Sequence, residues 1–131
     1  ATRNMVRQRA EERCEYCLMP DRALDLPFHV EHVVANVHRV DNRPTNLAWA
    51  CPRCNLRKGP NLAAMDPTTG SVVELFKPRT MVSHEHFVIH EGTIDGLTPC
   101  GRGTVQLLDM NQEQRVHHRR KLIDQGMFLA D

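Results

Sequence analysis

The pattern of apolar and polar positions predicts a series of short elements in the first half of the chain. Residues 2–13 contain good helix formers with apolar positions at Met5, Val6 and Ala10, which predicts a short helix. We expect strands at 26–34 and 47–50, a polar connecting loop at 35–45, and a helix at 52–58 that Gly59 and Pro60 terminate. This half of the chain is therefore a strand, strand, helix unit.

The second half reads as a smaller set of strands and helices. The segment 66–70, Asp-Pro-Thr-Thr-Gly, is a strong turn signal before a valine-rich strand at 71–76, and a further strand is expected at 86–90. Thr104 is a candidate N-cap for a helix that reaches Met110, and Asn111 for a last helix that ends near Gln125. The expected fold class is α+β.

Size and composition predict one domain over residues 1–131, in which a bound metal would add to the stability of the core. The chain has 131 residues and is 40% hydrophobic but only 5% aromatic, so its core has few large rings. The segment from Arg39 to Lys58 contains five basic residues and one acidic residue, Asp41. That excess suits phosphates, although a solvated basic surface would have the same composition.

Targeting signals are absent from the pattern. No apolar run approaches the roughly 18 residues of a membrane span, and the first residues do not resemble a secretory signal. Four of the five cysteines fall in two Cys-x-x-Cys pairs, a spacing more typical of a metal site in a reducing compartment than of a disulfide framework. We expect a cytoplasmic protein that does not associate with membranes.

The two cysteine pairs predict a structural zinc site. Each pair offers two thiolates from a tight turn, so Cys14, Cys17, Cys51 and Cys54 can surround one tetrahedral ion. Unligated thiols and a redox pair are the alternatives. Four soft thiolates leave no open coordination position, which favours a structural over a catalytic role for Zn²⁺.

Three further motifs, in their order along the chain, resemble the HNH endonuclease family. They are Glu31-His32 at the end of the first predicted strand, Asn46-Leu47, and the run CNLRKG at 54–59. Together with the two Cys-x-x-Cys pairs they look like the subclass with two zinc knuckles. The similarity covers a core at about 10–61, and residues from about 62 to 131 look like the C-terminal extension of small bacterial members. It implies a ββα-metal core with a strand and helix extension.

The resemblance also implies roles for individual residues. His32 would be the general base, because an imidazole titrates near neutral pH. Glu31 and Asn55 would hold a divalent cation, Mg²⁺ or Mn²⁺, with the hard oxygen ligands that such ions prefer. Asn46 would support the geometry of the loop. Hydrolysis of a phosphodiester requires these same parts: a base, a cation and groups that align them.

Nucleic-acid contacts are expected from basic residues near these motifs. Arg57 and Lys58 are the first candidates for phosphate contacts, Arg53 is a further one, and His38 occupies the loop-histidine position of the family. The chain departs from many relatives in having Glu31 for aspartate and His38-Arg-Val for a His-Gly-Gly loop. The expected substrate is double-stranded DNA.

Three functions fit these features. The first is a metal-dependent HNH endonuclease that nicks or cuts DNA by hydrolysis. The second is a zinc-stabilised nucleic-acid-binding module in which the catalytic positions serve only as structure. The third is an accessory or toxin domain whose partner supplies specificity. An acid, a base and an amide that converge on one point favour the first function, because a binding module has no need of them. The residues do not reveal a homodimer or a partner protein.

Overall fold

The chain forms two compact units in the computed structural model, which describes residues 1–128. Unit 1 comprises Ala1–Leu62 and Lys77–Met81, and unit 2 comprises Ala63–Phe76 with the residues from Val82 on. Each unit combines helices with two-stranded antiparallel sheets, so the fold class is α+β. Within the described part of the chain, the helices lack the length and apolar character of a membrane-spanning segment. The expected single domain over 1–131 stays a prediction.

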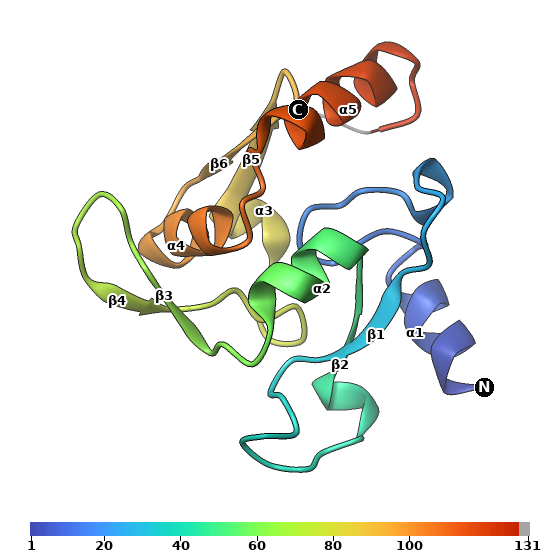
Figure 1. Ribbon diagram of the computed structural model, residues 1–131, viewed down its shortest axis with the longest axis vertical. Coiled ribbons are helices and arrows are strands. Elements are labelled where there is room, and N and C mark those ends of the chain that lie inside the picture. The colour runs from blue at the N-terminus through green and yellow to red at the C-terminus, as the bar shows by residue number, and fades with distance from the viewer. Residues whose placement is uncertain (129–131) are drawn as a thin grey trace. The chain divides into compact units, whose positions relative to one another are not determined.

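Unit 1 contains the predicted strand, strand, helix arrangement (Figure 1). Strands β1 and β2 pair antiparallel, with His29 opposite Ala50 and His32 opposite Leu47, and α2 packs against β1. Its elements are α1 (Thr2–Arg9), η1 (Asp21–Ala23), β1 (His29–His32), η2 (Pro44–Asn46), β2 (Leu47–Ala50) and α2 (Pro52–Lys58).

Two elements of unit 1 are shorter than the sequence predicts. Helix α1 ends at Arg9, because Glu11 and Glu12 adopt positive φ angles of 56° and 61° that no right-handed helix contains. Strand β1 ends at His32. Beyond it the backbone N–H of Val34 donates to the Asn46 side chain instead of a strand partner.

Strand β2 lies at the centre of the unit 1 core, since all four of its residues are buried. The Trp49 ring lies 5.9 Å from the Phe28 ring, centroid to centroid, and the Arg3 guanidinium covers it at 4.6 Å. Its indole N–H donates to Asp21, so the one polar atom of the ring is satisfied. A strand that is buried on both faces gives the site a rigid support.

Unit 2 contains two further hairpins, β3 with β4 and β5 with β6. The predicted strands at 71–76 and 86–90 correspond to β4 and β5, whereas the sequence pattern does not predict their partners β3 and β6, which have the same lengths of three and four residues. The elements are β3 (Ala63–Met65), β4 (Val72–Glu74), α3 (Ser83–His86), β5 (Phe87–His90), β6 (Thr93–Gly96), α4 (Pro99–Leu107) and α5 (Glu113–Asp124).

The helix caps of unit 2 differ from those predicted. Helix α4 starts at Pro99, where the Thr98 hydroxyl accepts from the N–H of Gly101, and Thr104 instead lies inside the helix. A Cβ on Gly101 would lie 2.2 Å from the His86 carbonyl oxygen, so close packing requires glycine inside this helix. Helix α5 is capped by Gln112, because the Asn111 amide forms two hydrogen bonds with the Ile94 backbone.

Candidate active site and metal centre

The four cysteines of the two predicted knuckles form one buried cluster. Their Sγ atoms all lie within 4.8 Å of one another, and Cys17 and Cys51 approach to 3.8 Å. Each knuckle is a tight turn in which a backbone N–H points at sulfur: Cys17 N to Cys14 Sγ, and Cys54 N to Cys51 Sγ. The second of these contacts also caps α2, with Pro52 as its first residue.

The chemistry of the cluster is compatible with structural zinc. Burial raises the pKa of the Cys14 thiol well above its usual value, and the neighbouring thiols raise it further. Four thiolates at this position therefore require a cation to neutralise them. A closed set of four sulfurs is the donor set of structural zinc sites. Through it the N-terminal knuckle is tied to the start of α2.

Glu31 lies inside unit 1, on the opposite face of β1 from His32. Its side chain is 6% exposed, with a hydrogen bond at Oε2 and an ion pair at Oε1. The Tyr16 hydroxyl donates to Oε2 at 2.7 Å, and the Lys58 ammonium lies 2.6 Å from Oε1. Burial raises the pKa of Glu31 above its usual value, while Lys58 and Tyr16 oppose that shift.

His32, the last residue of β1, is partly exposed and paired with the loop that follows. Its Nε2 lies 2.8 Å from Asn42 Oδ1. An amide oxygen only accepts hydrogen bonds, so Nε2 carries the proton and Nδ1 keeps its lone pair. The structure thus orients the imidazole with a nitrogen that can accept a proton, which is the property required of a base.

Asn46 ties the two ends of the 35–45 loop together. Its Oδ1 accepts from the N–H of Val34 at 2.9 Å, and its Nδ2 donates to the carbonyls of Val34 and Asp41. The side chain is buried, and all of these contacts are to backbone. The supporting role expected for Asn46 agrees with this geometry. Arg43 holds the pKa of Asp41 well below its usual range, which stabilises the same loop.

Helix α2 has an outward and an inward face. Arg53 and Arg57 are exposed, four residues apart on the same face, and Asn55 is half-buried. Lys58 differs from the sequence expectation: it is 2% exposed and points inward, four residues after the buried Cys54. We therefore leave Lys58 out of the candidate phosphate contacts. His38 is exposed in the loop, where its Nε2 donates to the Pro60 carbonyl at 2.8 Å.

Comparison with known proteins agrees with this arrangement. The family model described as HNH endonuclease matches residues 14–61. An HNH domain occupies this segment. It contains both knuckles, β1, β2 and α2, together with Glu31, His32, Asn46 and Asn55. No curated protein and no solved structure matches the chain. HNH domains are in general those of endonucleases that use divalent metals and act on DNA.

Glu31 and Asn55, which are expected to hold a catalytic cation, carry oxygen ligands that suit such an ion. A carboxylate from β1 and an amide oxygen from α2 are hard donors, and these two elements pack together. A positive charge already lies on this carboxylate, namely the Lys58 ammonium, so the position accepts a cation. The donor set is therefore suitable, and the Lys58 ammonium lies beside one of its oxygens.

The HNH domain depends on two residues that the sequence does not single out. Tyr16, between the cysteines of the first knuckle, is 2% exposed and binds Glu31. Asn42 orients His32. Nothing in the spacing predicts these contacts. The burial of Lys58 could be inferred from the sequence, because a position four residues after an inward-facing cysteine lies on the same helix face.

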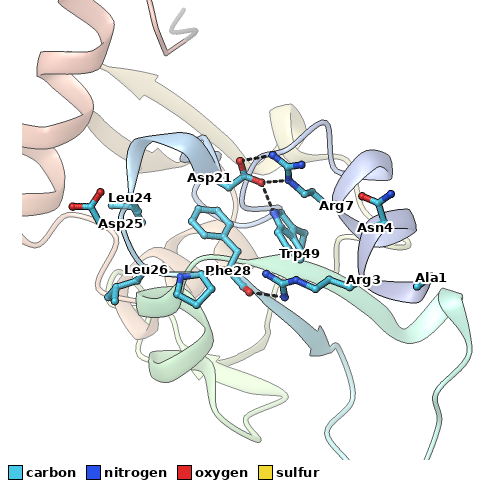
Figure 2. Close-up of a pocket in the computed structure, with 11 residues that line it drawn as sticks. Ala1, Arg3, Asn4, Arg7, Asp21, Leu24, Asp25, Leu26, Phe28 and Trp49 are labelled. Carbon is cyan, nitrogen blue, oxygen red and sulfur yellow. Dashed lines mark hydrogen bonds and ion pairs between the residues drawn. The ribbon is translucent and has the colours of Figure 1, made fainter.

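A separate hollow of about 630 Å³ opens near α1 in unit 1 (Figure 2). Its floor includes the rings of Phe28 and Trp49. Two of the arginines around it have partners within the protein: Arg7 pairs with Asp21, and Arg3 donates to the Phe28 carbonyl. None of the predicted site residues lines this hollow, and we assign it no role.

Proposed function

We propose that this protein is a metal-dependent endonuclease that hydrolyses phosphodiester bonds of double-stranded DNA. The observation that supports this most is the position of His32 in the HNH domain. It ends β1 with its Nε2 proton held by Asn42, and the adjacent Glu31 faces the helix that carries Asn55. The proposed base and one member of the proposed cation-binding pair thus occupy consecutive residues of β1, and the other member lies on α2.

In the proposed mechanism His32 Nδ1 accepts a proton from the attacking water. The water oxygen forms a bond to phosphorus, the bond to the 3′ oxygen breaks, and that oxygen takes a proton from solvent. The products are a 5′-phosphate and a 3′-hydroxyl. Asn42 keeps the imidazole in the required tautomer, and Asn46 holds the loop on which Asn42 lies.

Glu31 and Asn55 would hold Mg²⁺ or Mn²⁺ in this proposal. When bound, the cation supplies positive charge that stabilises the phosphorane and the leaving oxygen. Arg53 and Arg57 would contact flanking phosphates from the exposed face of α2, and His38 would contribute from the loop. Cys14, Cys17, Cys51 and Cys54 would bind structural Zn²⁺ and take no part in the chemistry.

A second candidate function is a zinc-stabilised nucleic-acid-binding module without activity. One specific observation favours it: both oxygens of Glu31 already have protein partners. Binding would then rest on the exposed arginines of α2 and on the 35–45 loop. In this case the protein retards DNA in a gel but does not cleave it, whichever divalent ion is added.

Cleavage of supercoiled plasmid separates the two functions. We expect the zinc-loaded protein to nick the plasmid with Mg²⁺ or Mn²⁺ and not in EDTA. His32→Ala should lower the rate about 10²- to 10⁴-fold, the usual contribution of a general base, and leave DNA binding and zinc content unchanged. His90→Ala is the matched control, since His90 is an exposed histidine at the end of hairpin strand β5. Cleavage that persists in His32→Ala removes His32 from the role of base.

A further inference from the structure

We infer that Lys58 is a resident cation of the Glu31 carboxylate and that a divalent ion must displace it to bind there. The inference rests on the ligand set of the proposed function. The Lys58 ammonium lies 2.6 Å from Glu31 Oε1, 3.0 Å from the Val33 carbonyl oxygen and 3.3 Å from the His32 carbonyl oxygen. One side chain of α2 therefore contacts three consecutive residues of the segment that carries the predicted base.

Contacts within the protein occupy the ammonium. It donates to the carbonyls of His32 and Val33, and it forms an ion pair with Glu31 Oε1. Its side chain is also buried, and so is that of Glu31. A buried charge is tolerated only when it is paired, so each of these two groups requires the other or a substitute of the same charge.

A divalent cation would be such a substitute for Lys58. It would use the same carboxylate oxygen, and two positive charges at that distance in a buried site repel each other strongly. Lys58 also lies on α2, one turn after Asn55, so the ammonium and an ion between Asn55 and Glu31 would compete for one space. Binding of the ion therefore requires the lysine side chain to turn outward, and the affinity for the ion is lowered by the stability of the lysine pair.

Mn²⁺ binding to the zinc-loaded protein without DNA tests this competition. Titration followed by electron paramagnetic resonance should show Lys58→Met binding Mn²⁺ about tenfold more tightly than the wild type, within the usual range of coupling between ligands. Lys121→Met removes the same charge from the exposed surface of α5 and should leave the affinity unchanged. Glu31→Gln combined with Lys58→Met should abolish the gain. Unchanged or weaker binding in Lys58→Met overturns the inference.

A second measurement uses the unaltered protein, in case Lys58→Met does not fold. The lysines of the chain lie at 58, 77 and 121, so acetylation of each can be followed by mass spectrometry. Without a divalent ion Lys58 should react slowly because it is buried, and Mg²⁺ should accelerate its modification about tenfold while Lys121 reacts at a constant rate. Protection of Lys58 that Mg²⁺ does not change overturns the inference.

These readouts separate the inference from the proposed function, since neither uses DNA or cleavage. Tighter Mn²⁺ binding in Lys58→Met, with no plasmid cleavage by the wild type, supports the competition and refutes the nuclease. Cleavage that depends on His32, together with an Mn²⁺ affinity that Lys58→Met does not change, supports the nuclease and refutes the competition.

Discussion

Removal of the metal from the four-cysteine cluster should unfold unit 1. The cluster joins the turn at Cys14 and Cys17 to the start of α2, and its thiols are buried and close together. Without the cation these thiols become protonated and lose the bonds that hold the two segments. We expect both a strong zinc chelator and the substitution Cys14→Ser to have this effect.

The expected loss is as large as the stability of the unit itself. Structural zinc in small domains contributes about 10–16 kcal/mol at neutral pH. Domains of ordinary size are stable by only about 5–15 kcal/mol, and small ones bury a smaller fraction of their surface. The main segment of unit 1 ends at Leu62, and its core has few large rings beyond Phe28 and Trp49. Hydrophobic burial alone should therefore not keep it folded.

Fluorescence can follow this unfolding selectively. Trp49 is the one tryptophan of the chain and Tyr16 the one tyrosine, and both are buried in unit 1. Chelation should shift the Trp49 emission to that of an exposed indole. Far-UV circular dichroism should fall only in part, because α4 and α5 belong to unit 2.

Cys100→Ser is the control for this experiment. Cys100 lies in α4 and outside the cluster, so the variant should bind as much zinc as the wild type and melt at the same temperature. The reasoning is refuted if the metal-free protein retains an unchanged, cooperative Trp49 transition.

Two further predictions concern stability. Asn46→Ala should cost about 2–4 kcal/mol in thermal or denaturant unfolding, because it removes three hydrogen bonds to the backbone of Val34 and Asp41, while the zinc content stays constant. Asp66→Asn should lower the melting temperature at pH 7, since Arg102 holds the pKa of Asp66 well below its usual range. A depressed pKa stabilises above about pH 4 and is lost as the pH falls below that value, so the difference from the wild type should shrink toward pH 2.

Exposed residues of the same types serve as controls for these variants. Asn4→Ala on α1 and Asp95→Asn on β6 should change the melting temperature little at any pH. An effect of Asn46→Ala no larger than that of Asn4→Ala would show that the 35–45 loop does not need the hydrogen bonds of the Asn46 side chain. A difference between Asp66→Asn and the wild type that grows in acid would contradict the sign derived for Asp66.

The cysteine cluster, β2 and α2 could be predicted from the sequence because short spacings determine them. A Cys-x-x-Cys turn brings two sulfurs together whatever surrounds it, and Pro52 and Gly59 mark the ends of α2. The caps of α4 and α5 could not be predicted in the same way. Asn111 does not cap α5, because its side chain binds the backbone of Ile94, 17 residues earlier in the sequence.

The sequence predicts the residue types of the candidate site but not the contacts that those residues make. His32, Asn46 and Asn55 follow from motifs, whereas the partner of His32 lies ten residues later in an irregular loop. A basic residue near the end of a helix usually contacts solvent, whereas Lys58 is buried. Its distance of four residues from Cys54 was the better guide, since it places both side chains on the buried face.

Helix α2 links the proposed zinc site to the proposed chemistry. Its inward face carries Cys54, which belongs to the cluster, and Lys58, which pairs with Glu31. The other partner of Glu31 is Tyr16, which lies between the cysteines of the first knuckle. Loss of the structural metal would therefore release both partners of Glu31, and the cation-binding position would be lost with the fold. Activity that EDTA removes and Mg²⁺ alone restores must then come from protein that has kept its zinc.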